Sequence, residues 1–233
     1  MNLVLLEDGD FLDDSRVQLK GRRHLHIQRI LRVRVGDEIT VGYLGGRIGR
    51  GRVERLEAAS VTLAVNFDRE PPRALPITLV LALPRPPVLR RLLAGVTAMG
   101  LKRVILLDSA AVEKSFWQSH SLEVNAIREH LCLGLEQSRD TILPEVEIHR
   151  DFDAFVDQAL PGLLEDKDGY LAHPDPVSSR KTTGPALLAV GPEGGWTEAE
   201  QERLTRAGLL PFGLGTRALR VEMAVPALLA RLL

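Results

Sequence analysis

From residue 77 onwards, short apolar runs alternate with segments of helical periodicity, a pattern that few folds accommodate. The runs ITLVLAL, RVILLDS and PALLAVG lack an alternating polar face, as do strands that are covered on both sides. The segments VLRRLLAGVTAMG and EVNAIREHLCLGLEQS instead place apolar residues three and four positions apart. This order predicts an α/β domain with helices on both faces of a sheet, further strands at VEIHR and GYLAH, and a final helix at the C-terminus.

A proline-rich segment, DREPPRALP, precedes this pattern and opposes regular structure. Upstream of it, VRVGDEITVGY, GRVERLE and SVTLAVNF have the alternation and turn residues of strands. GRRHLHIQRILRV places apolar Leu25, Ile30 and Leu31 between basic residues, which predicts a short amphipathic helix with an arginine-rich outer face. We therefore expect a small β-rich domain at residues 1–73 and the α/β domain at residues 74–233.

The charge of the chain is unevenly distributed. The net charge is only −1, yet residues 16–55 contain eleven Lys or Arg against three acidic residues. Such a segment is typical of a phosphate-binding surface, although a solvated face that serves solubility has the same composition. The strength of the excess favours nucleic acid, and the candidate RNA-binding residues are Lys20, Arg22, Arg23, Arg29 and Arg32.

Composition excludes several classes of protein. Hydrophobic residues make up 45% and charged residues 26%, as in folded globular proteins. No apolar run approaches the roughly 20 residues of a membrane span, and the start, MNLVLLEDGD, lacks a signal-peptide pattern, so we expect a cytoplasmic protein. The single cysteine, Cys132, forms no internal disulfide, and His24 and His26 have no third metal ligand nearby. We expect no metal site.

A bare loop, Gly191-Pro192-Glu193-Gly194-Gly195, follows the expected strand ALLAV. Thr197, with Glu200 three residues later, forms a capping-box pattern that predicts the start of a helix. Glycines between a strand and a helix let main-chain amides approach a ligand closely. The same glycines also suit a tight turn without any ligand.

A second bare loop, Gly213-Leu214-Gly215, lies near the C-terminus and is followed by Arg217 and Arg220. Val225, Leu228, Leu229 and Leu232 then form the apolar stripe of a helix. Pro226 is compatible with that helix only within its first turn. Glu222 would then lie near the helix start, where a carboxylate also favours the helix dipole.

GPEGGW followed by LGTRALRVEMAV resembles the two signature loops of the bacterial 16S ribosomal RNA uridine-N3 methyltransferases, a family of the SPOUT superfamily. GLEQSRDTILPEVEI resembles the helix-to-strand segment of that family, and the basic start resembles its PUA-like RNA-binding domain. The resemblance implies a C-terminal α/β trefoil-knot domain after a small β-rich PUA-like barrel, and a homodimer. It also implies that S-adenosyl-L-methionine binds at Leu171, His173, Pro174, Gly191, Pro192, Glu193, Gly194, Gly195, Leu214, Gly215, Arg217 and Leu219.

The activity implied by the resemblance is methylation of N3 of a specific uridine in 16S rRNA, with that RNA or the small ribosomal subunit as the partner. Arg220 would stabilise charge on the uracil or a nearby phosphate, and Glu222 would accept the N3 proton or position the arginine. Two alternatives remain open. The chain could methylate another RNA site or a ribose 2′-hydroxyl, or it could be an RNA-binding ribosome-assembly factor without catalysis.

Overall fold

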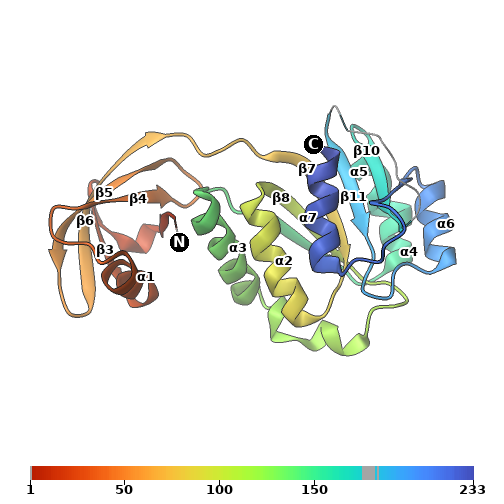
Figure 1. The fold of residues 1–233 in the computed structure, drawn as a ribbon, viewed down its shortest axis with the longest axis horizontal. Helices are drawn as coiled ribbons and strands as arrows, with labels where there is room; N and C mark the ends of the chain where they lie inside the picture. The colour runs from red at the N-terminus through yellow and green to blue at the C-terminus, as the bar shows by residue number, and fades with distance from the viewer. Residues whose placement is uncertain (1, 175–181, 183) are drawn as a thin grey trace. The chain divides into compact units, whose positions relative to one another are not determined.

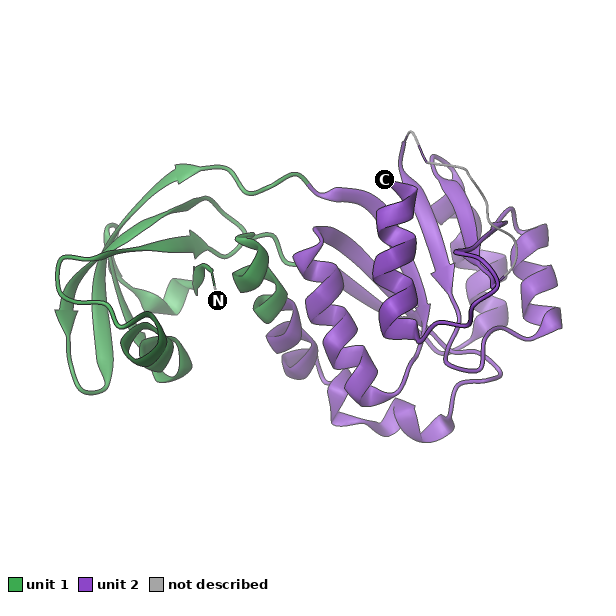
Figure 2. Cartoon of the chain, viewed as in Figure 1, with its two compact units in different colours: residues 1–73, 132–143 green, residues 74–131, 144–233 purple. Residues whose placement is uncertain are grey.

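The computed structural model describes residues 2–174, 182 and 184–233, and the chain divides into two compact units (Figure 2). Unit 1 comprises Met1–Arg73 and Cys132–Leu143, and unit 2 comprises Ala74–Leu131 and Pro144–Leu233. The break after residue 73 falls in the proline-rich segment. A division into residues 1–73 and 74–233 therefore leaves out a twelve-residue piece, 132–143, that belongs to the first unit.

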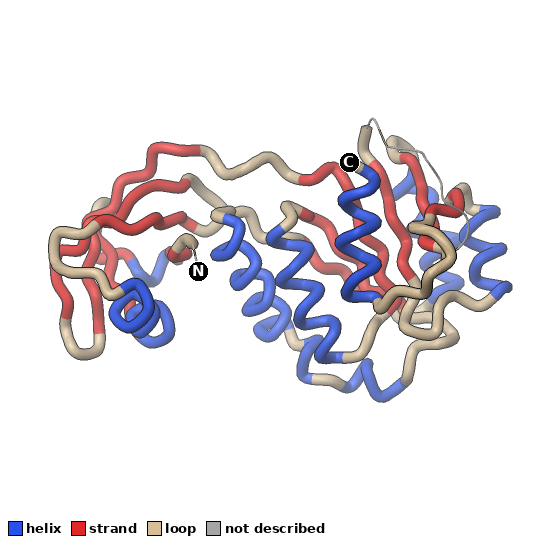
Figure 3. The backbone as a smooth tube through the Cα atoms, viewed as in Figure 1, coloured by secondary structure: helices blue, strands red, loops and turns tan. Residues whose placement is uncertain are grey.

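Unit 1 is built on a six-stranded sheet in the order β1-β4-β5-β6-β3-β2, which confirms the expected β-rich domain. Its strands are drawn in red in Figure 3. Only the pairing of β1 with β4 is parallel. Its core consists of the inward residues of the alternating strands, such as Val17, Leu19 and Val41. The strands are β1 (Val4–Leu6), β2 (Phe11–Asp13), β3 (Arg16–Lys20), β4 (Glu38–Tyr43), β5 (Ile48–Leu56) and β6 (Ser60–Arg69).

The helix expected in the basic segment is present as α1 (Gly21–His26), continued by a π-helical turn at Ile27–Leu31. Its buried face differs from the expected one. Leu25, Ile30 and Leu31 are exposed, whereas His24 and Ile27 are buried. His24 can be buried because its Nε2 lies 3.1 Å from the carbonyl oxygen of Glu57, so that its polar ring has a hydrogen-bond partner.

Residues 132–143 join unit 1 through polar contacts to its N-terminal part. The backbone amides of Asn2 and Leu3 donate to the carbonyl oxygen of Glu136 at 2.8 and 3.1 Å. The Gly45 amide donates to the carbonyl oxygen of Thr141 at 2.8 Å. These bonds satisfy backbone groups that unit 1 would otherwise leave without partners, and they explain why the piece belongs to it.

Unit 2 contains a six-stranded sheet in the order β12-β10-β11-β7-β8-β9, and all neighbouring strands are parallel. The expected α/β fold class is thus confirmed. Strand β11 is buried throughout and β7 is buried from Ile77 onwards, as their unbroken apolar sequences require. The strands are β7 (Leu75–Ala82), β8 (Leu101–Leu107), β9 (Glu145–His149), β10 (Asp168–Ala172), β11 (Ala186–Val190) and β12 (Leu210–Phe212).

Helices α2 (Pro86–Ala98) and α7 (Val221–Leu232) pack against each other, and α7 also contacts β11 (Figure 1). Pro226 lies inside α7, beyond its first turn, contrary to the sequence-based expectation. The cost is one helical hydrogen bond, because the Glu222 carbonyl finds no amide donor at Pro226. The remaining helices are α3 (Val124–Ser138), α4 (Phe152–Ala154), α5 (Leu160–Leu164) and α6 (Glu198–Arg206), with 3-10 turns at Asp8–Asp10, Lys114–Gln118 and His120–Leu122 and a π-helical turn at Phe155–Ala159.

Among the residues that the structure describes, no helix combines the length and the apolar character that crossing a membrane requires.

Candidate functional site

The candidate site forms where strands β10, β11 and β12 end. These strands are parallel neighbours, so their carboxyl ends lie at the same edge of the sheet. Each is followed by a loop: His173 and Pro174 come after β10, Gly191–Trp196 after β11, and Gly213–Arg220 after β12. Ligands of open α/β sheets bind at this edge, outside the carboxyl ends of the strands.

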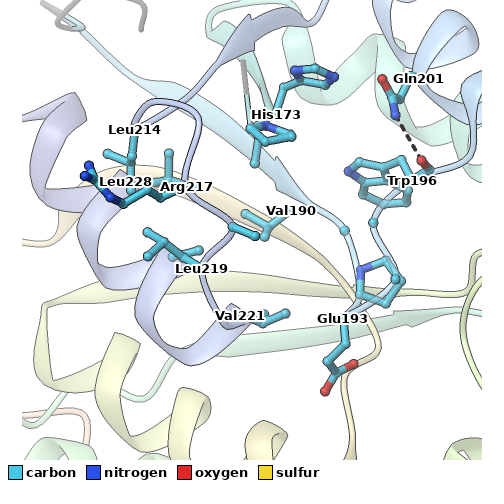
Figure 4. Close-up of a pocket in the computed structure, with 18 of the residues that line it drawn as sticks. His173, Val190, Glu193, Trp196, Gln201, Leu214, Arg217, Leu219, Val221 and Leu228 are labelled. Carbon is cyan, nitrogen blue, oxygen red and sulfur yellow. Dashed lines mark hydrogen bonds between the residues drawn. The ribbon is translucent and has the colours of Figure 1, made fainter. Parts of the chain in front are cut away.

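The three loops and α7 line a cavity of about 330 Å³ (Figure 4). The structure thus brings together the two glycine loops that are about twenty residues apart in sequence. Of the predicted cofactor residues, only Leu171 does not line the cavity, because it is buried within β10. The lining residues are Ala172, His173, Pro174, Val190, Gly191, Pro192, Glu193, Gly194, Gly195, Trp196, Gln201, Leu214, Gly215, Arg217, Ala218, Leu219, Val221, Ala224 and Leu228.

The loop after β11 folds tightly on itself. A Cβ atom at Gly191 would lie 3.0 Å from the Trp196 amide nitrogen and 3.2 Å from the Gly195 Cα. Gly195 has a φ of 74°, a left-handed conformation that glycine adopts without strain. The glycines therefore keep backbone close to backbone on this wall of the cavity.

Helix α6 begins directly after this loop, and its predicted capping box is confirmed. The Thr197 hydroxyl accepts a hydrogen bond from the Glu200 amide, and the Glu200 carboxylate accepts one from the Thr197 amide at 2.8 Å. The same buried carboxylate also accepts a 2.8 Å bond from the amide of Ala110. Glu200 is thus satisfied by backbone donors, and it fixes the end of the glycine loop to the segment after β8.

Ion pairs and a hydrogen bond stabilise the segments around the loop after β11. Arg203 of α6 pairs with Asp157 and Asp153, and hydrogen bonding to Asp157 is the main reason why the pKa of Arg203 is raised above its usual value. Glu193 of the loop accepts a 3.2 Å hydrogen bond from the backbone amide of Arg85. Glu193 therefore connects the cavity wall to the start of α2.

The predicted catalytic residues do not line this cavity. Arg220 is the exposed N-cap residue of α7, and Glu222 lies in the first turn of that helix. Glu222 Oε1 lies 3.3 Å from Arg91 Nη2 of α2. Their neighbours Leu219 and Val221 do line the cavity, so Arg220 and Glu222 lie beside it rather than inside it.

The predicted RNA-binding residues of unit 1 fall into two groups. Arg22 donates to both carboxylate oxygens of Glu136 at 3.0 and 2.9 Å, and Arg23 donates to both of Asp10 at 2.6 and 2.7 Å. Their guanidinium groups therefore already serve the fold of unit 1. The second group is exposed and forms no ion pair among the described residues: Lys20, Arg29 and Arg32.

Several lining residues were not predicted from the sequence. Val190, Ala218, Ala224 and Leu228 are apolar residues whose position beside a cavity no local pattern reveals. Trp196 is different, because it directly follows the glycines of the quoted GPEGGW motif. An aromatic residue at the end of a glycine loop is the signal in the sequence that indicates a lining position for Trp196.

Metal binding finds no support in the described ranges, where no group of three or more His, Cys, Asp or Glu residues is placed to hold an ion.

A model of the RNA methyltransferase domain family matches residues 71–233, which include the whole cavity. The chain belongs to this RNA methyltransferase family. Two relatives match along almost its full length. The "Ribosomal RNA small subunit methyltransferase E" of Treponema pallidum is 28% identical and the match covers 97% of this chain and 88% of the relative. The "Ribosomal RNA small subunit methyltransferase E 1" of Borreliella burgdorferi is 24% identical, with 97% and 95% covered.

A solved structure of the same family name has the same fold. The ribosomal RNA small subunit methyltransferase E of Neisseria gonorrhoeae, bound to S-adenosyl methionine, superposes with a TM-score of 0.77 at 23% identity. The match covers 99% of this chain and 95% of that one. The two chains thus share their fold over almost their full lengths.

Proposed function

We propose that this chain is a methyltransferase that uses S-adenosyl-L-methionine to methylate N3 of a specific uridine in 16S rRNA. The observation that carries the proposal is that both glycine loops line one cavity at the carboxyl edge of the sheet. The names of the full-length relatives support a small-subunit ribosomal RNA as the substrate. The uracil N3 position follows from the resemblance of the two loops to the uridine-N3 methyltransferases.

The cavity suits the cofactor. Its volume of about 330 Å³ falls in the usual range for small-molecule sites, which begins at about 300 Å³. Gly191, Gly194 and Gly195 let a ligand approach the backbone of this loop without a side chain in the way. His173, Pro174, Leu214, Gly215, Arg217 and Leu219 would hold the cofactor from the other loops, and the remaining predicted residue, Leu171, would act by supporting the β10 end.

When bound, the cofactor supplies an electrophilic methyl group, so the protein has to position the nucleophile and handle one proton. N3 of uracil carries a proton at neutral pH, and it has to leave before or during methylation. Glu222 would accept that proton or hold Arg220 in place, and Arg220 would stabilise the negative charge that develops on the uracil oxygens. Such proton transfer contributes roughly 10²–10⁴-fold in rate.

A second copy of the chain is part of the proposal. Arg220 and Glu222 lie beside the cavity of a single chain, and their apolar neighbours Leu219 and Met223 are 46% and 63% exposed. A homodimer that covers this surface would bury these side chains and complete the site. Sedimentation of the purified protein tests this, because a monomer at micromolar concentration would contradict the dimer.

RNA binding is assigned to unit 1, as a PUA-like domain whose exposed cations contact phosphates. The C-terminal segment that carries the second glycine loop is expected to form the trefoil knot.

Because ribosomal subunits are the substrate, we place the protein in the cytoplasm.

The decisive experiment is transfer of a labelled methyl group from the cofactor to small-subunit RNA or to isolated small subunits, followed by nucleoside mass spectrometry. The proposal predicts N3-methyluridine at a single position. A 2′-O-methyl nucleoside or another methylated base would show a different methyltransferase activity. Cofactor binding without any transfer to RNA or subunits would contradict the enzymatic proposal, and RNA binding without cofactor binding would identify an assembly factor.

A further inference from the structure

Trp196 lines the cavity, and the nitrogen atom of its indole ring is in an unusual environment. Only 7% of its surface is exposed, and among the residues that the structure describes its indole nitrogen has no hydrogen-bond partner. In Figure 4 the nitrogen edge of the ring faces the space bordered by Val190 and His173. Trp196 therefore holds a buried, unpaired donor in the wall of the cavity.

An indole N–H can donate one hydrogen bond and can accept none. Tryptophans that are this deeply buried normally pair that donor, because a buried donor without a partner loses its hydrogen bond to water and gains nothing in return. Exceptions in native structures call for an explanation, and a ligand that supplies the missing acceptor is one.

The position of the ring is fixed by its surroundings. The Gln201 side-chain amide donates to the backbone carbonyl oxygen of Trp196 at 2.9 Å. The ring packs against Phe152 with their centroids 6.1 Å apart, and the backbone of Gly191 approaches the Trp196 amide closely. A donor held in this way loses little freedom on binding, so its hydrogen bond contributes efficiently to affinity.

The charges of the cavity indicate which acceptor the indole meets. Among the described residues that line the cavity, Arg217 is the one with a permanent positive charge, and it is exposed. In Figure 4 its guanidinium group lies on the side of the cavity opposite Trp196. A carboxylate is strongly hydrated and costly to bury without a cation. The carboxylate of an amino acid group would therefore face Arg217 and water, whereas a neutral ring nitrogen or ribose oxygen can face the buried indole.

We infer that the Trp196 indole N–H donates a hydrogen bond to a neutral acceptor on the nucleoside half of the cofactor and thereby sets cofactor affinity. This inference rests on the proposed function, since it concerns the same cavity. It assigns a binding role to the indole N–H, a donor that phenylalanine lacks.

Trp196→Phe tests the inference because it removes the N–H and keeps an aromatic ring. Titration calorimetry with S-adenosylhomocysteine and with 5′-methylthioadenosine, which lacks the amino acid group, should show both ligands binding about 5- to 30-fold more weakly. The smaller ring also leaves a void that lowers the midpoint of thermal unfolding, so the affinities carry the test. A residue with only a structural role would lower the midpoint and leave both affinities of the folded protein unchanged.

Trp117→Phe is the matched control. Trp117 is the other tryptophan of the chain, its indole nitrogen also has no partner among the described residues, and it does not line this cavity. Its replacement should leave both affinities unchanged. If Trp196→Phe does not fold, β-(3-benzothienyl)alanine at position 196, introduced into the Trp117→Phe background, keeps the ring shape without the N–H and should give the same losses.

The outcomes separate this inference from the proposed function. If the wild-type protein binds neither ligand, the proposed function itself fails. If the wild type binds both and Trp196→Phe binds both equally well, the inference is overturned while the function stands. If only S-adenosylhomocysteine is weakened, the acceptor lies on the amino acid half, and the inference is likewise overturned.

Discussion

Glu222 Oε1 lies 3.3 Å from Nη2 of Arg91, which connects the first turn of α7 to helix α2. The side chain of Glu222 is 23% exposed and that of Arg91 is 61% exposed. The arginine therefore holds the carboxylate in place beside the cavity.

Glu222→Gln should slow methyl transfer by roughly 10²–10⁴-fold if the carboxylate accepts the N3 proton. The change keeps the size of the side chain and removes its charge. Because Glu222 does not line the cavity, the affinity for S-adenosylhomocysteine should stay within about twofold of the wild type. Single-turnover methylation and calorimetry measure the two quantities, and an unchanged single-turnover rate would refute the role of Glu222.

Arg91→Ala should have a smaller effect on the same reaction, on the order of tenfold, because it loosens the carboxylate without removing it. Single-turnover methylation and urea unfolding distinguish a positioning role of Arg91 from a structural one. A slower rate with unchanged stability supports positioning of the Glu222 carboxylate. A loss of stability with an unchanged rate would mean that Arg91 serves stability alone.

Arg22→Ala should destabilise unit 1 by roughly 2 kcal/mol. The change leaves the buried carboxylate of Glu136 without its bidentate partner, and the cost stays below that of a fully buried pair because half of the Arg22 side chain is exposed. Arg50→Ala removes an exposed pair with Glu38 and should change stability by less than about 0.5 kcal/mol. Urea unfolding measures both, and equal effects of the two variants would contradict a structural role for Arg22.

Replacing Lys20, Arg29 and Arg32 together by alanine should weaken RNA binding without changing cofactor affinity. If each cation contacts one phosphate, the slope of log K against log salt should become shallower by about two to three. A control variant with Arg50→Ala and Arg69→Ala removes cations that already pair with Glu38 and Asp68, and should leave the slope nearly unchanged. Equal slopes for the triple variant and the wild type would exclude these residues from the RNA interface.

Gly191→Ala should weaken cofactor binding by about tenfold or more, because the added Cβ would lie 3.0 Å from the Trp196 amide nitrogen and force the loop apart. Gly95→Ala is the contrasting change. Gly95 lies inside α2 with open space where the Cβ would be, so alanine should raise the unfolding free energy by roughly 0.5–1 kcal/mol. Calorimetry and urea unfolding give both values, and a Gly191→Ala variant with normal affinity would show that the loop tolerates a side chain.

An NMR titration of Asp13 tests the electrostatics of the β2–β3 turn. A hydrogen bond from Arg16 is the main cause that lowers the pKa of Asp13 from 3.8 to about 2. A lowered pKa stabilises the fold above pH 4, and that contribution is lost as the pH falls from about 4 to about 2. Arg16→Ala should raise the pKa of Asp13 from about 2 towards 3.8, although the hydrogen bonds from Ser15 still lower it. A value that stays near 2 would place the main cause elsewhere.

The parts of the fold that the sequence predicts are those that depend on local patterns. The apolar runs identify β7, β8 and β11, and the Thr197–Glu200 capping box locates the start of α6. Strand β12 escapes prediction because it has only three residues, Leu210–Phe212, and owes its existence to pairing with β10. Pattern analysis also assigns Leu25 to the inner face of α1, whereas the buried residue next to it is His24, whose ring has a partner in Glu57.

In the candidate site, too, local sequence patterns predict some residues, whereas others depend on contacts made only in the folded chain. Glycine loops are visible as sequence, so nearly every residue predicted for them lines the cavity. The partners of Arg22 and Arg23 are not visible, because Glu136 lies more than a hundred residues away from Arg22 and only the folded chain brings them together. Charge counts predict a basic surface, and they cannot tell an arginine that is already paired from one that is free to bind.

Residues 132–143 also bear on how the protein is made. During translation the nascent chain completes the strands of unit 1 at residue 69, but the carboxylate of Glu136 and the backbone partners of Asn2 and Leu3 are synthesised much later. The first unit therefore waits for its last segment while unit 2 is already emerging. A chimera that grafts residues 1–73 alone onto another enzyme would carry the sheet without the segment that completes it.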